Sequence, residues 1–223
     1  MTRKREPATP ASAPAPCGRV SAVGEGSAAA RAGVRPGDCL LAINGRPVRD
    51  VIDVQFLGAE ERLELAVERA GETLSLAGER AYDQPLGLDF EEPVFDGLRE
   101  CANHCPFCFV RQLPAGLRRT LYIQDDDYRY SFLQGSFVTL TNLDAADWAR
   151  IEEQHLSPLY VSVHATDPAL RRRLLGRRAA EPIMEQLRAL AGMDITVHTQ
   201  VVLVPGENDG PALDQTIGDL AGL

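Results

Sequence analysis

Three cysteines stand close together near the middle of the chain, in the run Cys101-Ala-Asn-His-Cys105-Pro-Phe-Cys108. Their CX3CX2C spacing places three thiolates on one short loop, and three thiolates can hold three irons of a [4Fe–4S] cluster. The fourth iron then has no protein ligand and is free to bind another molecule. The spacing therefore predicts a metal site made of Cys101, Cys105 and Cys108, with the aromatic Phe107 directly before its last ligand.

Two other uses of these thiols stay open. A structural zinc site could take the same cysteines, with His104 or a distant histidine as the fourth ligand. Zinc sites usually combine two closely spaced pairs, however, and Cys17 and Cys39 each stand alone in the sequence. Disulfides fit less well, because three clustered cysteines among five leave odd thiols unpaired. The pattern therefore favours the iron–sulfur cluster over zinc and over inert thiols.

The length and charge of the chain limit the classes of function. A chain of 223 residues fits one large globular domain or two smaller ones. The formal net charge of −9 gives no positive field that would draw the protein to nucleic acid, and no apolar run reaches the roughly 20 residues that span a bilayer. We therefore expect neither a nucleic acid nor a membrane as partner. Arginines cluster at residues 171–173 and 177–178, which indicates a solvated helix face or, as the alternative, a phosphate-binding patch.

The first residues are basic and then rich in alanine, proline and serine, without the apolar core of a secretion signal. Such a segment buries too little surface to offset its ordering entropy, so we expect a disordered tail over residues 1–17. The missing signal and the unpaired cysteines both predict a cytoplasmic location, where thiols stay reduced. An oxygen-sensitive cluster also needs that compartment.

Residues 18–84 show the short strands and tight turns of a small β-domain. An apolar strand lies between turn signals at residues 36–38 and at Asn44-Gly45. We expect the other elements to be a strand at residues 20–23, a short helix at 28–32, a second helix at 50–61, and a hairpin of residues 63–67 and 73–76 that turns at Ala70-Gly71.

The run V-R-P-G-D-C-L-L-A-I-N-G at residues 34–45 resembles the core of the β-sandwich called PDZ. PDZ domains add an extended peptide to a sheet edge and capture its carboxylate with backbone N–H groups, so the resemblance implies a peptide or protein ligand. The capturing loop normally precedes the strand that begins at Arg19, where this chain has its tail. Residues 85–90 could supply the loop in a permuted domain, or form an interdomain strand; both interpretations stay open.

Residues 85–223 alternate predicted strands and helices, which indicates a parallel sheet or barrel. Asp144 and Asp147 fit a capping box, and Asp167-Pro168 fits the start of a helix that ends at Gly176. We expect strands just before Cys101 and at residues 137–141, 159–164 and 195–204, with helices after Asp144, after Asp167, at 180–191 and at 209–220.

Polar side chains gather at the carboxyl ends of these predicted strands, where barrels hold their chemistry. Strands buried on both faces are nearly all apolar, so a polar side chain there needs an internal partner. A structural role stays open for each, since threonine is a good strand former and a single histidine is often hydrogen-bonded in a core. The residues are Thr139, Thr141, Asn142, Ser162, His164, His198 and Gln200.

The run C-A-N-H-C-P-F-C-F-V-R-Q-L-P-A-G-L-R-R at residues 101–119 resembles radical S-adenosylmethionine (SAM) proteins, and more narrowly the DUF512 family of PDZ-containing radical SAM iron–sulfur proteins. The motifs S-V-H-A-T-D-P at 162–168 and H-T-Q-V-V-L-V-P-G-E-N-D-G at 198–210 extend the resemblance over residues 18–223. It implies an α/β protein in which an N-terminal PDZ-like β-sandwich precedes an incomplete radical-SAM-type (β/α) barrel, the two domains spanning residues 18–84 and 85–223.

The resemblance also implies the cofactors and their contacts. A [4Fe–4S] cluster on the three cysteines binds SAM, receives an electron from a donor such as flavodoxin or ferredoxin, and yields a 5′-deoxyadenosyl radical that acts on an unknown substrate. Phe107 would pack beside the SAM adenine. Residues 139–142 read T-L-T-N where relatives carry a G-G-E-like motif, so the Asn142 amide oxygen and backbone carbonyls would accept from the SAM ammonium. The implied SAM-binding residues are Phe107, Thr139, Thr141, Asn142, Ser162, His164 and Gln200.

Two features leave alternatives open. The run Asp125-Asp126-Asp127 fits either a loop paired with Arg118, Arg119 and Arg129 or a loop that faces substrate or a cation. A radical SAM barrel resembles six βα units, whereas we expect four strands up to Val204, so the barrel would be incomplete and its activity reduced or lost. The competing hypotheses are therefore a radical SAM enzyme, a PDZ peptide-binding adaptor with an inactive barrel, and a zinc-stabilised structural protein.

Overall fold

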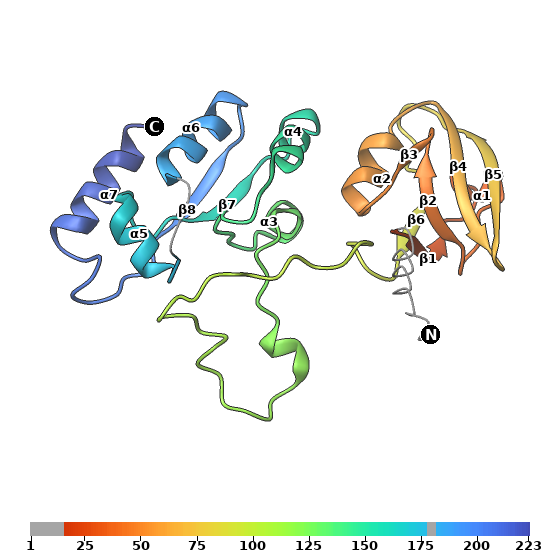
Figure 1. Cartoon of the computed structure of the whole chain (residues 1–223). Coiled ribbons are helices and arrows are strands. Elements are labelled where there is room, and N and C mark those ends of the chain that lie inside the picture. Colours follow the sequence, from red (N-terminus) through yellow and green to blue (C-terminus); the bar gives the residue numbers. More distant parts are fainter. Residues whose placement is uncertain (1–15, 178–181) are drawn as a thin grey trace, which may run out of the picture. The chain divides into compact units, whose positions relative to one another are not determined.

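The computed structural model describes residues 16–177 and 182–223 and divides into two compact units, one ending at Gly97 and one running from Leu98 to Leu223 (Figure 1). Most of the tail expected over residues 1–17, together with Arg178 and the expected start of a helix at residue 180, lies outside the described residues. Each unit is described by itself below. The architecture is mixed α/β, as predicted.

The first unit is built on an antiparallel sheet with the strand order β5-β4-β2-β1-β6, and β3 pairs with β2. The two predicted hairpin turns are confirmed: Asn44 and Gly45 have φ of 50° and 73°, and Ala70 and Gly71 have φ of 53° and 85°. Positive φ at both central residues gives the turn whose twist matches a hairpin. The strands are β1 Gly18–Val23, β2 Cys39–Ile43, β3 Arg46–Pro47, β4 Arg62–Arg69, β5 Glu72–Glu79 and β6 Leu88–Phe90.

Two short helices complete this unit. Helix α1 Ala28–Ala32 begins at the Ser27 hydroxyl, which accepts from the Ala30 N–H, and ends at Gly33 with φ of 92°. Helix α2 Val51–Leu57 begins at Asp50 but stops short of the expected residue 61. Glycine follows it at position 58, where a Cβ would lie 2.5 Å from the Val54 carbonyl oxygen, and the chain must already enter β4 at Arg62.

The hydrophobic core of the first unit is formed by residues of that unit alone. Its centre consists of side chains with 0–1% exposure, among them Val20, Leu40, Ile43, Leu65 and Val67. The sulfur atoms of Cys17 and Cys39 are joined, with the Cα atoms 5.4 Å apart. Our expectation that these two cysteines are unpaired is therefore wrong, which removes one ground for the predicted reducing compartment.

Residues 85–90 belong to this first sheet. Strand β6 pairs with β1, with Leu88 opposite Val23 and Phe90 opposite Val20, and Leu86 is buried in the core. The interpretation of this segment as an interdomain strand is therefore wrong. Phe90 and Phe95 also pack together, with ring centroids 4.9 Å apart, and Phe95 lies against the backbone of Gly18.

The second unit contains fewer strands than expected. Strands β7 and β8 pair in parallel, while residues 137–141 contribute one parallel bridge, between Val138 and Val161. The strand expected before Cys101 is one antiparallel bridge, between Glu100 and Asp125. These strands do not show a partial barrel. The elements are η1 Arg119–Tyr122, α3 Tyr128–Gln134, α4 Ala145–Glu153, β7 Leu159–Ser162, α5 Pro168–Leu174, α6 Ile183–Gly192, β8 Val197–Gln200 and α7 Pro211–Ala221.

In two segments that were expected to be strands, a backbone N–H group donates to a side chain instead of to a neighbouring strand. The Asp126 carboxylate accepts from the Thr139 N–H at 2.6 Å, and Leu140 then turns away with φ of 58°. Beyond β8, the Val202 N–H donates to the His164 ring at 3.2 Å. A ladder cannot continue where its donors are already used.

The predicted starts of two helices are confirmed, whereas α7 begins at Pro211, two residues after the expected residue 209. Asp144 and Asp147 form the capping box of α4, and the Asp167 carboxylate accepts from the Leu170 N–H at the start of α5. Helix α3 was not predicted, although Asp127 at its start and Gly135 at its end, with φ of 77°, are typical boundary residues. Within the described residues, no helix is long and apolar enough to cross a membrane.

Candidate functional site

The cysteine loop is held at several points by the body of the second unit. The Cys101 N–H donates to the Gln124 carbonyl at 2.7 Å, and the His104 N–H donates to the Leu175 carbonyl at 2.8 Å. Gly176 passes so close to this loop that a Cβ there would lie 2.5 Å from the His104 carbonyl oxygen. The loop is therefore fixed against the end of α5, and the backbone of residue 176 needs glycine.

The three thiols are partly buried and influence one another. Burial, together with the charges of the neighbouring Cys101 and Cys108, raises the pKa of Cys105 to about 11. Burial likewise raises the pKa of Cys101, with a contribution from the negative charge of Asp126. Three such thiolates repel one another until a cation neutralises them, which is what a metal centre does.

The three thiols of the cysteine loop could serve two kinds of metal site, a single ion or a cluster. Among the described residues, no group of three or more His, Cys, Asp or Glu side chains is close enough to hold a single metal ion. A [4Fe–4S] cluster binds each cysteine through a different iron. Three coupled thiols on one anchored loop fit the donor set of such a cluster.

Asp126 joins the cysteine loop to the end of the predicted strand at residues 137–141. Its carboxylate is 1% exposed and accepts from the Thr139 N–H and from the Thr139 hydroxyl, both at 2.6 Å. Burial raises the pKa of Asp126, although the two hydrogen bonds from Thr139 oppose the rise. Asn103, in the cysteine loop, also donates to the Thr139 hydroxyl, at 2.9 Å. The predicted site residue Thr139 therefore lies beside the cysteine loop.

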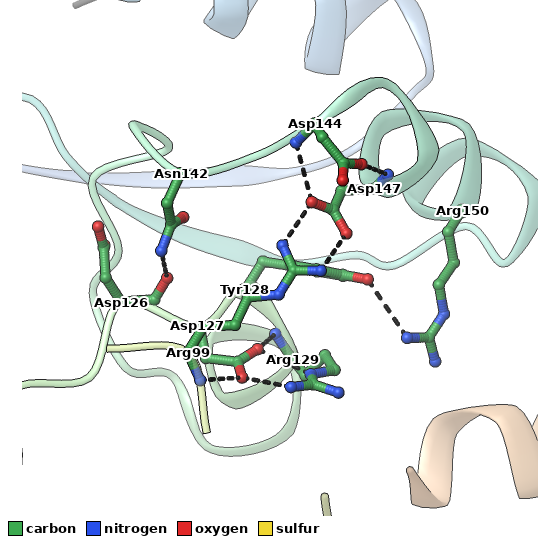
Figure 2. A network of polar contacts seen from close by, with 9 residues as sticks. All are labelled: Arg99, Asp126, Asp127, Tyr128, Arg129, Asn142, Asp144, Asp147 and Arg150. Carbon is green, nitrogen blue, oxygen red and sulfur yellow. Dashed lines mark hydrogen bonds and ion pairs between the residues drawn. The ribbon is translucent and has the colours of Figure 1, made fainter. Parts of the chain in front are cut away.

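The Asn142 side chain has one satisfied and one unsatisfied end. Its amide nitrogen donates to the main-chain oxygen of Asp126 at 2.8 Å, as Figure 2 shows. Its buried amide oxygen has no hydrogen-bond partner in the structure. An unpaired buried acceptor costs free energy unless a ligand supplies the donor. Asn142 is thus suited to accept from a bound ammonium group.

Asp127 has a different role from its neighbour. It starts α3, pairs with Arg129 at 2.7 Å and accepts from the Arg99 N–H at 3.1 Å (Figure 2). The Arg99 side chain in turn makes a bidentate ion pair with Asp147, at 2.5 and 2.7 Å. The acidic run therefore divides: Asp127 is salt-bridged with one of the predicted arginines, Asp126 faces the cysteine loop, and Asp125 is exposed.

His164 and Phe107 are far apart in the sequence but in contact in the structure. Their rings contact edge to face, with centroids 4.9 Å apart. Burial, together with the positive charge of Arg171, lowers the pKa of His164 to about 4, so the ring is neutral at physiological pH. Because Nδ1 accepts from the Val202 N–H, the ring proton lies on Nε2.

The remaining predicted site residues differ in their burial and in their contacts. Thr141 contacts both the Thr139 hydroxyl, at 2.8 Å, and the Asn103 amide oxygen, at 3.2 Å. Ser162 is buried, whereas the side chain of Gln200 is exposed and only its main-chain oxygen, which accepts from the Val163 N–H, reaches this region. The exposed His198 ring stacks on Tyr160. Their roles toward a cofactor stay predictions.

Arg171 was not predicted to be part of the buried site. The expectation of a solvated arginine face is wrong for this residue, which is 1% exposed and donates to the carbonyls of Val163, Thr139 and Ser162 at 3.1, 2.8 and 3.3 Å. Burial lowers its pKa to about 10, and its Nη1 has no hydrogen-bond partner. The helical spacing of Arg171, Leu174 and Leu175 along one face was the available signal.

Two family models match the chain, one within the β-unit and one over the cysteine-bearing α/β-unit together with the last residues of the β-unit. A model of a PDZ domain matches residues 19–69, and a model of a Radical SAM-like domain matches residues 80–223. No match was found among curated proteins. A protein with an N-terminal PDZ domain and an α/β-unit of this kind is a PDZ–radical SAM protein. Because the second match covers more than half of the chain, the chain belongs to the Radical SAM-like family; membership of DUF512 stays a prediction.

Proposed function

We propose that this protein is a radical SAM enzyme in which Cys101, Cys105 and Cys108 hold a [4Fe–4S] cluster and SAM binds beside it. The observation that carries the proposal is the unpaired Asn142 amide oxygen, because the Asn142 side chain bonds to Asp126, which in turn contacts Asn103 of the cysteine loop. The cluster and SAM, when bound, supply one-electron cleavage of a sulfonium to a 5′-deoxyadenosyl radical. On this proposal the parallel pair β7–β8 and the Val138 bridge are part of a (β/α) barrel.

The chain's own residues would bind and orient these groups. Asn142 accepts from the ammonium of SAM through its free oxygen, and Phe107 offers an aromatic face for the adenine. The His164 ring is neutral and can donate a hydrogen bond only through Nε2, since Nδ1 is occupied. Asp126 fixes the strand end that carries Thr139, while Ser162 and Gln200 stay proposed contacts for ribose and carboxylate. An electron donor such as flavodoxin or ferredoxin, and a cytoplasmic location, also belong to this proposal.

The metal tests the proposal directly. Anaerobic reconstitution with iron and sulfide should give a brown protein with about four irons per chain. Cys105→Ala should abolish the colour and the bound iron, whereas Cys39→Ala, in the other unit, should keep both. One zinc and no iron after anaerobic purification would overturn the proposal in favour of a zinc-stabilised protein.

A second candidate function, peptide binding, is favoured by the position of β6. Among the described strands β6 ends its sheet and pairs only with β1, so its other edge is open to an added strand. Gly87 before it has φ of 79°, and a Cβ there would lie 2.2 Å from the Ser27 Cβ, so this turn needs glycine. Binding of a C-terminal peptide that is lost in Leu88→Lys would support the adaptor hypothesis; no detectable binding would refute it.

A further inference from the structure

Asn103 lies inside the cysteine loop and is 2% exposed. Its amide nitrogen is 3.3 Å from the Cys101 sulfur, 2.9 Å from the Thr139 hydroxyl and 3.5 Å from the Asp126 carboxylate. Its amide oxygen accepts from the Thr141 hydroxyl at 3.2 Å and from the Arg177 guanidinium at 3.3 Å. The side chain is therefore a buried link between a predicted metal ligand and the strand end.

The surroundings fix which end of the amide faces the sulfur. The Arg177 guanidinium can only donate, so the amide oxygen must face it, and the Thr141 hydroxyl lies on the same side. A flipped amide would place its oxygen against the Cys101 sulfur and the Asp126 carboxylate, and its N–H groups against the cationic Arg177. Hydrogen-bond networks assign amide orientation on this basis. The N–H of Asn103 consequently points at the Cys101 sulfur.

We propose that Asn103 raises the reduction potential of the cluster by donating a hydrogen bond to the Cys101 sulfur. The inference rests on the proposed function, because it requires a cluster on the three cysteines. One electron enters the cluster from an external one-electron reductant and adds negative charge, which spreads onto the sulfur ligands. A donor at the sulfur stabilises that added charge, and hydrogen bonds to ligand sulfurs are a recognised determinant of cluster potential.

The nearby Asp126 carboxylate increases the expected effect of Asn103 on the reduction potential. This carboxylate lies 3.5 Å from the Asn103 amide nitrogen and repels any charge added to the cysteine loop. The positively polarised amide group of Asn103 lies close to both that carboxylate and the sulfur and partly offsets this repulsion. Removing the amide therefore loses the hydrogen bond and exposes the sulfur to the carboxylate, and both changes disfavour the reduced cluster.

The test is an anaerobic redox titration of the reconstituted full chain, followed by electron paramagnetic resonance of the reduced cluster. In Asn103→Ala the ratio of reduced to oxidised cluster at a fixed potential should fall about tenfold, which is a shift of about 59 mV for a one-electron couple. Asn103→Asp should shift it further in the same direction. Asn208→Ala is the matched control, because Asn208 is equally buried but bonds to the backbone of Val202, Val204 and His164.

A second measurement is used for variants that bind too little cluster for a redox titration. Resonance Raman spectra of the oxidised cluster report the iron–sulfur bonds directly, and loss of the Asn103 donor should shift the cysteine-ligand stretching bands in Asn103→Ala but not in Asn208→Ala. Unchanged potential and unchanged bands would overturn the inference and leave the proposed function intact. An unmodified chain that takes up no iron would refute the proposed function and the inference together.

Discussion

The two units differ in what they bury. In the first unit the centre is aliphatic, and its buried carboxylates, Asp38, Asp50 and Asp53, bond to nearby backbone N–H groups or arginines. In the second unit the largest fully buried side chain is an arginine, Arg171, and Asp126 is buried nearby. Burying charge is expensive in both units. The buried carboxylates of the first unit bond to backbone N–H groups three or four residues away, whereas Asp126 and Arg171 bond to segments of the candidate site further along the sequence. The buried charges of the first unit therefore fix local structure, and those of the second unit hold a polar site together.

The largest expected effect comes from removing the buried cation. Arg171→Met keeps the length of the side chain but deprives three carbonyls of their donor and leaves the Asp126 charge without its nearby cation. Breaking buried charge interactions costs about 3–5 kcal/mol. The second unit should therefore unfold at clearly lower denaturant concentration, while the first unit keeps its own transition, measured by circular dichroism of the full chain.

Arg173→Met is the matched control on the same helix. Arg173 pairs with Glu207 at 2.9 Å on the surface, with the two side chains 62% and 44% exposed. Such pairs contribute about 0–1 kcal/mol, so this variant should change little. Equal effects of the two substitutions would show that Arg171 is not the central support of the second unit.

The self-contained core of the first unit predicts that it folds alone. A protein of residues 16–97 should be β-rich and cooperative, because every member of its core cluster lies within that range. A protein of residues 16–84 lacks β6 and the buried Leu86, whose burial alone is worth about 1.5–3 kcal/mol. Urea unfolding should show the shorter protein to be less stable by at least that amount. Equal stability would mean that β6 is not part of the domain.

A smaller effect tests the polar rim of the first unit. The hydrogen-bonded Arg69 lowers the pKa of Asp38, and both carboxylate oxygens lie 2.7 Å from that guanidinium. Asp38→Asn should destabilise the chain by about 1–3 kcal/mol at pH 7.

The sign of its pH dependence follows from the lowered pKa. The pair contributes in full above the unfolded-state pKa of Asp38, and its contribution is lost as pH falls through the lower folded-state value. The stability difference between the unmodified chain and Asp38→Asn should therefore be constant from pH 7 to about pH 5 and narrow below pH 4. A difference that grows on acidification would contradict this assignment.

The difference between local and distant contacts also explains which elements could be predicted from the sequence. Turns and caps depend on neighbouring residues, so Asn44-Gly45, Ala70-Gly71 and the Asp144–Asp147 capping box could be located in advance. Strand ends in the second unit could not. Their N–H groups are taken by side chains far along the chain, as when Asp126 binds the Thr139 N–H and His164 binds the Val202 N–H.

The candidate site likewise contains residues that the sequence could predict and residues that it could not. Cysteine spacing and the strand-end position of Asn142 are visible in the sequence, and these gave the candidate residues. Asn103 carries no such signal, because it occupies an unspecified position between two cysteines and its role depends on Thr141, Asp126 and Arg177. Arg171 was misjudged because a cluster of arginines normally faces solvent, and only the fold shows which of them turns inward.

The last prediction tests whether the unpaired Asn142 amide oxygen of the second unit marks a ligand contact. The Asn142 oxygen has no partner, and a hydrogen bond to a charged group is worth about 1.5–3 kcal/mol. Asn142→Ala should therefore weaken SAM binding to the reconstituted protein by about tenfold or more without changing its iron content, measured by equilibrium binding. Gln200→Ala is the comparison, since its exposed side chain was predicted from the same resemblance. A larger loss in Gln200→Ala than in Asn142→Ala would show that SAM lies toward β8, and that the free Asn142 oxygen, like the free Arg80 Nε of the first unit, is not a ligand contact.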